Sequence, residues 1–331
     1  MNWQVNMQKA NNRKIGVILL NLGGPERLED VEPFLFNLFS DRQIIHLSPF
    51  PFLQKPIARF IAKRRAPNSC KAYKLIGGGS PLRQITEQQG ATLATLLGQV
   101  GDFKVDMAMR YWHPDARQTL EEMGRAGITR IVAFTLYPHY SKATTGSSVT
   151  DLAEVAAALP YDFEITAIES WPDQPDYIAA LVKGVHRELG RCAGKPTLVY
   201  SAHSLPMKFI EEGDPYLNDL TKTIIAVEEQ LAMRGKLCFQ SRSGPVKWLA
   251  PSTPDTLVDL AQKGVKEVVV LPISFVSDHV ETLYEIDIQY AELARDLGMR
   301  LVRTRSLNTD PLFMKGLAKL VIAACRGKRW L

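Results

Sequence analysis

Residues 119–134, TLEEMGRAGITRIVAF, align without gaps on residues 256–271, TLVDLAQKGVKEVVVL. Identities are few, but polar and apolar positions match except at 121/258 and 126/263, at an offset of 137 residues from residue 119 to residue 256. Each copy has a helical pattern, a glycine suited to a helix C-cap and an apolar run typical of a buried strand. The repeat predicts two similar βα lobes, each offering a strand-end loop to a shared cleft; chance similarity between two βα units is the alternative.

Length and composition agree with two lobes of a globular protein. The chain has 331 residues, which is more than one compact domain usually contains. Its composition, 46% hydrophobic and 23% charged, is ordinary for a globular protein. The net charge of +5 favours an anionic substrate or a membrane surface, and it is too small to indicate nucleic acid.

Three features bear on the cellular compartment. No apolar run reaches the roughly 20 residues that span a bilayer, and the polar leader of residues 1–14 lacks the apolar segment of a signal peptide. The cysteines are far apart, which argues for a reducing compartment and against a zinc or iron–sulfur site built on cysteine. We therefore expect a cytoplasmic protein. The cysteines are Cys70, Cys192, Cys238 and Cys325.

Two glycine-rich segments do not match nucleotide-binding motifs. Residues 21–25, NLGGP, follow an apolar run but lack the GxGxxG pattern, which disfavours a nicotinamide oxidoreductase. Residues 77–81, GGGSP, lack the Gly-Lys-Ser/Thr ending of a phosphate-binding loop and are interpreted as a hinge.

Residues 47–66, LSPFPFLQKPIARFIAKRRA, interleave aromatic and aliphatic side chains with lysines and arginines. Pro49, Pro51 and Pro56 should keep the first half of this segment from forming a plain helix. One interpretation is an amphipathic segment packed on its own core. The other is an apolar, cationic lip, the name used below for residues 47–66, that touches a membrane or a flat apolar ligand.

Residues 271–294, LPISFVSDHVETLYEIDIQYAELA, begin as a buried strand and continue in helical spacing. Asp278, Glu281, Glu285, Gln289 and Glu292 share one predicted helix face, and Tyr290 falls on the other side. Acidic groups at a strand's carboxyl end suit a ligand site of an α/β sheet. The alternative is a solvated helix capped by the Asp278–Glu281 pair.

A histidine is predicted at a second strand end. Residues 196–200 form an apolar run, and SAHSLP follows at residues 201–206, so His203 should emerge at the carboxyl end of a strand. A lone histidine is often structural, but this one lies in the lobe that carries Glu281. The pair suits a divalent metal or a proton transfer. Because two ligands are fewer than a durable zinc site uses, such a metal would be in transit.

These two segments resemble the ferrochelatases, which insert ferrous iron into protoporphyrin IX. The likeness rests on SAHSLP at residues 201–206 and SDHVETLYEID at residues 277–287, and it runs nearly end to end. It also includes residues 20–25, 61–67, 76–81, 110–111, 144–148 and 239–251.

The resemblance implies an α/β fold of two Rossmann-like lobes, with parallel sheets flanked by helices around a porphyrin cleft. We expect an N-terminal lobe over residues 14–165 with the lip at 47–66, and a C-terminal lobe over residues 166–307 that carries His203 and Glu281. A C-terminal helix and tail should occupy residues 308–331.

The resemblance also implies roles for individual residues. His203 and Glu281 would bind metal and take the pyrrole protons, with Glu285, Asp278 and His279 on or beside the path of metal or protons. Porphyrin-contacting positions fall on Arg65, Arg64, Arg110, Tyr111, Leu22, Ser141, Trp248 and Phe275.

Ferrous iron would be a substrate, and no cofactor would be bound permanently. Some relatives bind an iron–sulfur cluster through a cysteine-rich C-terminal extension; here the tail offers only Cys325, so we expect no cluster. The lip would make peripheral contact with a membrane, and no nucleic acid is expected. Coproporphyrin as substrate, another chelated metal such as cobalt or nickel, or a porphyrin or haem carrier remain alternatives.

Overall fold

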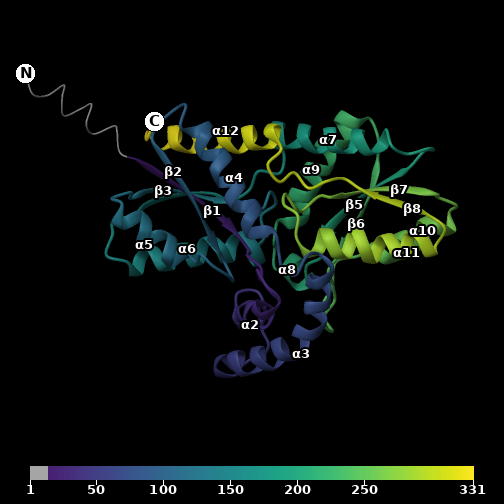
Figure 1. Ribbon diagram of the computed structural model, residues 1–331, viewed down its shortest axis with the longest axis horizontal. Coiled ribbons are helices and arrows are strands. Elements are labelled where there is room, and N and C mark those ends of the chain that lie inside the picture. Colours follow the sequence, from purple (N-terminus) through teal and green to yellow (C-terminus); the bar gives the residue numbers. More distant parts are fainter. Residues whose placement is uncertain (1–13) are drawn as a thin grey trace, which may run out of the picture.

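The computed structural model describes residues 14–331, in which two four-stranded parallel sheets lie side by side (Figure 1). The first has the strand order β2-β1-β3-β4 and the second β6-β5-β7-β8. The strands of the first are β1 (Ile15–Asn21), β2 (Phe103–Met109), β3 (Arg130–Thr135) and β4 (Glu164–Ile168). Those of the second are β5 (Thr197–His203), β6 (Gly235–Gln240), β7 (Glu267–Pro272) and β8 (Arg300–Arg303).

Helices cover both faces of each sheet, as a parallel sheet requires. The central strand β1, IGVILLN, is buried along its whole length because both faces are covered. The flanking helices are α4 (Leu82–Leu97), α5 (Ala116–Arg125), α6 (Ser147–Ala158), α7 (Pro175–Leu189), α8 (Met207–Glu211), α9 (Tyr216–Leu231), α10 (Thr253–Gln262), α11 (Ala291–Asp296) and α12 (Pro311–Gly327).

The predicted repeat is confirmed. Helix α5 and strand β3 correspond to helix α10 and strand β7 at the same offset of residues, and β3 and β7 hold the same position in their sheets. Gly127 and Gly264 have φ angles of 70° and 78°, the left-handed conformation that ends a helix at little cost only for glycine. The fold class of two Rossmann-like lobes is therefore confirmed.

The boundaries between the predicted domains remain a prediction. Strand β4 runs from Glu164 to Ile168, so the proposed division after residue 165 passes through it. Helix α12 belongs to the predicted C-terminal unit, yet it packs against α4, α7, β3 and β4 (Figure 1). The tail thus completes the core of the first sheet.

The lip lies on a helical hairpin that projects away from both sheets (Figure 1). The hairpin consists of α2 (Val31–Ser40), η2 (Pro51–Leu53) and α3 (Gln54–Leu75). Pro51 starts a 3-10 turn as expected, but Pro56 lies in the first turn of a continuous helix, where its missing N–H has no partner to lose. None of the helices in residues 14–331 is long and apolar enough to cross a membrane.

The lip exposes aromatic side chains. Phe50, Phe52 and Phe60 are 58%, 74% and 67% exposed, while Ala58 and Ala62 are buried against α2. One face of the segment therefore packs on its own small core, as the first interpretation expected, and the other presents phenylalanine to solvent. Contact with a membrane or a flat ligand stays a prediction. The polar leader lies at residues 1–14, of which residues 1–13 are outside the described part of the chain.

Candidate functional site

His203 is the last residue of β5, as predicted. Its backbone is held on both sides: the N–H donates to Ser274 Oγ at 2.9 Å, and the carbonyl oxygen accepts from the hydroxyl of Tyr216 at 2.9 Å. The side chain is 35% exposed, so the imidazole remains accessible at the carboxyl edge of the second sheet.

Glu281 meets His203 directly. It is the first residue of the helix η4 (Glu281–Tyr290), which follows the loop after β7. Its Oε2 lies 2.8 Å from Nδ1 of His203, and its side chain is 18% exposed. The folded chain therefore brings the two predicted site residues together, although 78 positions separate them in the sequence.

Ser241 links Glu281 to Glu285. Its Oγ lies 2.8 Å from Glu281 Oε2 and 2.7 Å from Glu285 Oε2, and Gln240 Nε2 also reaches Glu285 at 3.2 Å. Ser241 has a φ angle of 65°, which is uncommon for a residue other than glycine and often marks a functional loop. Ser241 was not predicted as a site residue, because no pattern in the neighbouring sequence indicates a serine with a left-handed backbone conformation.

Helix η4 is a π-helix, which changes the predicted acidic row. Hydrogen bonds from i to i+5 place Tyr290 above Glu285, and its hydroxyl lies 3.4 Å from Glu285 Oε2. The prediction that Tyr290 faces away from the acids is wrong for this reason. Gln289 and Glu292 are exposed, so the site keeps only two members of the row, Glu281 and Glu285.

The alternative in which Asp278 caps the helix is not what the structure shows. The N-cap of η4 is Val280, with no side-chain cap hydrogen bond. Asp278 instead accepts from Arg303 Nη1 at 3.0 Å, from Ser306 at 2.8 Å and from Asn308 at 2.9 Å. Burial opposes the charge on Asp278, but these contacts outweigh it and lower the pKa. Asp278 anchors the loop that precedes Glu281.

His279 lies beside the pair without touching it. Its Nδ1 is 3.0 Å from the carbonyl oxygen of Ser277, and its Nε2 is 4.0 Å from Glu281 Oε2. The ring packs against Phe275 with centroids 4.3 Å apart and the planes tilted by 58°, and the Phe275 centroid is in turn 6.2 Å from that of the His203 ring. Burial lowers the pKa of His279, which favours the neutral imidazole.

The three central groups have shifted pKa values. Burial disfavours the charged forms of His203 and Glu281, but each stabilises the charge of the other, so the pKa of His203 is raised and that of Glu281 is lowered. Burial, followed by the charge of Glu281, raises the pKa of Glu285 to about 7. Near neutral pH, Glu281 is therefore ionised and Glu285 is partly protonated.

The raised pKa of Glu285 predicts a pH-dependent effect of Glu285→Gln on stability. The folded state binds this proton up to about pH 7, whereas the unfolded chain releases it near its ordinary pKa of 4.5. Stability from this group is thus lost as pH rises through that window. We expect Glu285→Gln to be more stabilising at pH 8 than at pH 5 by roughly 1–3 kcal/mol in urea unfolding.

The matched control for that measurement is Glu292→Gln, which removes an exposed carboxylate beyond the end of η4. An effect of Glu285→Gln that has the same size at both pH values contradicts the raised pKa.

Four predicted site residues lie in the N-terminal lobe, beyond strand ends. Leu22 follows β1, and Arg110 and Tyr111 follow β2, where their N–H groups donate to the carbonyl oxygens of Asn21 and Leu22 at 2.8 and 3.0 Å. Ser141, after β3, is buried and donates its hydroxyl to Asp214 of the other lobe at 3.0 Å.

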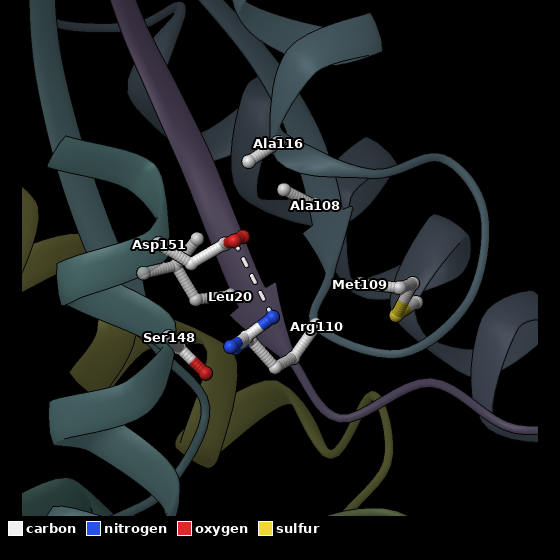
Figure 2. Close-up of a pocket in the computed structure, with 7 residues that line it drawn as sticks. All are labelled: Leu20, Ala108, Met109, Arg110, Ala116, Ser148 and Asp151. Carbon is white, nitrogen blue, oxygen red and sulfur yellow. Dashed lines mark hydrogen bonds and ion pairs between the residues drawn. The ribbon is translucent and has the colours of Figure 1, made fainter. Parts of the chain in front are cut away.

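Figure 2 shows Arg110 among the residues that line a small cavity, with a dashed line to Asp151. The cavity measures about 10 Å³, room for about one water molecule, so it is not a substrate pocket. The guanidinium of Arg110 is already bound, to Asp151 at 3.3 Å, to Asp41 at 2.7 Å and to Ser147 at 2.8 Å. The other residues that line the cavity are Leu20, Ala108, Met109, Ala116 and Ser148.

The remaining predicted contacts lie on the lip and on the loop after β6. Arg64 and Arg65 are exposed on α3, and the Arg65 guanidinium lies 5.5 Å from the centre of the Phe39 ring. Trp248 is half-buried, and its indole Nε1 is buried with no hydrogen-bond partner within the described residues.

The structure does not test the metal-binding roles predicted for His203 and Glu281. Within residues 14–331, no group of three or more histidine, cysteine, aspartate or glutamate side chains is arranged to hold a metal ion. Glu281 contacts the Nδ1 side of the His203 imidazole, so Nε2 faces away from that carboxylate.

Comparison with known proteins places this chain in a family. The model of the family described as Ferrochelatase matches residues 14–325. A ferrochelatase of Desulfotalea psychrophila is 55% identical, covering 94% of this chain and 97% of its own length. One from Geotalea uraniireducens is 50% identical, covering 93% and 97%.

Solved structures with low identity share the fold. SirB from Bacillus subtilis with Fe³⁺ superposes with a TM-score of 0.56 at 11% identity, covering 95% of this chain and 97% of its own. The sirohydrochlorin chelatase SirB from Bacillus subtilis subspecies spizizenii, in complex with cobalt, gives 0.52 at 14% identity, covering 94% and 95%. At these identities the likeness shows the architecture alone.

Proposed function

The chain belongs to the ferrochelatase family, and we propose that it inserts ferrous iron into protoporphyrin IX, releasing two protons, at His203 and Glu281. The observation that carries this proposal is the 2.8 Å contact between His203 Nδ1 and Glu281 Oε2 at the end of β5. Membership of the family supports metal insertion as the activity. The choice of protoporphyrin and the roles of the residues are proposals.

The contact supports one arrangement of the protons on His203. An ionised Glu281 can only accept a hydrogen bond, so Nδ1 carries a hydrogen, and in the neutral imidazole Nε2 keeps its lone pair. That lone pair can take a pyrrole proton or bind the incoming iron. The imidazolium that forms is then stabilised by the adjacent carboxylate, and general bases of this kind work best with a pKa near the working pH.

Protons can leave along Ser241. Its single hydroxyl hydrogen cannot be donated to Glu281 and Glu285 at once, although its oxygen lies within 2.8 Å of both. A proton on Glu285 resolves this, because Glu285 then donates to Ser241 and Ser241 donates to Glu281. Once Glu285 has released this proton to solvent, a protonated Glu281 can donate to Ser241 while Ser241 donates to Glu285. A proton then passes from Glu281 to Glu285, which we propose as the exit.

Substrate binding is proposed to use both lobes and the lip. The planar macrocycle would contact Leu22, Tyr111, Trp248 and Phe275, since aromatic and aliphatic side chains suit a flat apolar ring. Its propionates would meet the exposed guanidinium groups of the lip. Arg65, Arg64, Arg110 and Ser141 complete the proposed substrate-contacting set.

Arg65→Ala is expected to raise KM for porphyrin about three- to tenfold and to leave kcat nearly unchanged, because a propionate fork binds substrate and transition state alike. Steady-state zinc insertion, followed by porphyrin fluorescence, measures both constants. Lys71→Ala, an exposed cation further along α3, is the matched control. An unchanged KM for Arg65→Ala would remove Arg65 from the substrate site.

The proposed activity itself is tested with the unmodified protein. Ferrous iron and zinc are each offered with protoporphyrin and, separately, with coproporphyrin, and insertion is followed by absorbance. Faster insertion into coproporphyrin would correct the substrate. Porphyrin binding without any insertion would favour a carrier, and insertion of cobalt or nickel in preference to iron would change the metal.

Location and partners are further parts of the proposal. The exposed phenylalanines and cations of the lip support peripheral contact with a membrane, where a poorly soluble porphyrin would be exchanged. A cytoplasmic location rests on the widely spaced cysteines. Iron is handled as a substrate, and the absence of a permanent cofactor remains a prediction.

A further inference from the structure

The α2–α3 hairpin, residues 31–75, stands apart from both sheets and carries the lip (Figure 1). Among the ion pairs of residues 14–331, one joins this hairpin to the rest of the chain: Asp41 with Arg110, at 2.7 Å. Asn37 Nδ2 adds a hydrogen bond to the carbonyl oxygen of Tyr111 at 3.1 Å. The hairpin is thus pinned electrostatically at one place, the carboxyl end of β2.

The carboxylate of Asp41 is buried and hydrogen-bonded at this contact. Its side chain is only 6% exposed, and Oδ2 accepts from Arg110 at 2.7 Å, from the Tyr111 hydroxyl at 2.8 Å and from Ser147 at 2.9 Å. Its Oδ1 accepts from the N–H of Gln43 at 2.7 Å. Both oxygens of a buried, acceptor-only group are therefore surrounded by donors.

The contact is transmitted to the lip through a stiff connection. Gln54, at the start of α3, donates to the carbonyl oxygens of Phe39 and Ile45 at 2.8 Å each and accepts from the N–H of Leu47 at 3.2 Å. The loop between α2 and α3 is thereby fastened on both sides of Asp41. A shift at Asp41 should therefore move the lip rather than be absorbed by the loop.

We propose that Asp41 is a positioning residue that holds the lip at the carboxyl edge of the first sheet, in the orientation that porphyrin binding requires. This rests on the proposed function, because the lip matters only if it contacts porphyrin. Asp41 acts through Arg110, Tyr111 and Ser147 and does not touch the reacting atoms. It should therefore affect binding of the porphyrin and spare the proton chemistry at His203.

The test is Asp41→Asn, assayed for metal insertion. An amide has one acceptor and one donor group, so in either orientation it sets N–H groups against the donors on one of its two sides. Loss of the charge-assisted bonds should raise KM for porphyrin about three- to tenfold, with kcat within about twofold and KM for zinc unchanged. A merely structural role would lower the active fraction and leave KM alone.

Two further variants keep the test decisive. Glu32→Gln removes an exposed acid from the same helix and should behave as the unmodified protein. Ser147→Ala removes one donor to Asp41 and should raise KM for porphyrin less than Asp41→Asn does; it decides the question if Asp41→Asn fails to fold. An unchanged KM in the decisive variant overturns the proposal, as does a fall in kcat alone. If the unmodified protein inserts no metal, the proposed function fails first.

Discussion

Glu281→Gln lowers kcat for metal insertion by about 10²–10⁴-fold, the usual contribution of a positioned acid–base group. Glutamine can still accept the hydrogen bond from His203 Nδ1, which is 2.8 Å away, but it supplies no charge to stabilise an imidazolium. His203→Ala should cause a loss of similar size. The double variant should be no slower than the worse single one, because residues that act as a unit are not additive.

The measurement is single-turnover insertion of zinc, with porphyrin binding followed separately. Binding should survive in both variants, since neither removes the lip nor the aromatic contacts. Glu292→Gln is the matched control, because it removes an exposed acid that the sequence placed on the same face as Glu281. Insertion at the normal rate in both His203→Ala and Glu281→Gln would show that the site lies elsewhere.

Of the substitutions proposed here, Trp171→Ala should have the largest effect on stability, a loss of about 3–5 kcal/mol in the free energy of unfolding. Trp171 is 3% exposed, and its ring lies 6.1 Å from Phe134, 5.1 Å from Tyr177 and 6.0 Å from Phe313 between centroids. Its indole donates to the carbonyl oxygen of Thr135 at 3.0 Å. Alanine would leave a cavity where β3, α7 and α12 meet and would strip a buried carbonyl of its donor.

Urea unfolding gives this free energy for the variant and the unmodified protein. Phe52→Ala is the control, because it deletes an aromatic ring that is 74% exposed and should change stability by less than about 0.5 kcal/mol. A loss below about 1 kcal/mol for Trp171→Ala would mean that the aromatic cluster closes over the gap without cost.

The architecture was readable from local pattern. The helix–glycine–strand repeat could be aligned from residues alone, because a buried parallel strand must be apolar on both faces and a helix that ends in a left-handed residue strongly prefers glycine. For the same reason His203 could be placed at a strand end. These are properties of short segments, and each segment carries its own signal.

The details of the site were not local, and there the expectations were partly wrong. Tyr290 was assigned to the wrong face because the residues of a π-helix do not distinguish it from an α-helix. Its wider turn, with bonds from i to i+5, changes which residues share a face. The position of Asp278 in the sequence suggests a helix cap, but in the folded chain its oxygens accept hydrogen bonds from Arg303 and Asn308 instead.

Residue order alone thus dictated two lobes and their strand ends, and it pointed to the histidine and the glutamate proposed for the chemistry. Tertiary structure decided that His203, Ser241, Glu281 and Glu285 share one hydrogen-bonded group, and that Asp41 pairs with Arg110. The physical reason is that hydrogen bonds and pKa shifts depend on distances of about 3 Å between side chains. Such distances, between residues tens of positions apart, exist only once the chain has folded.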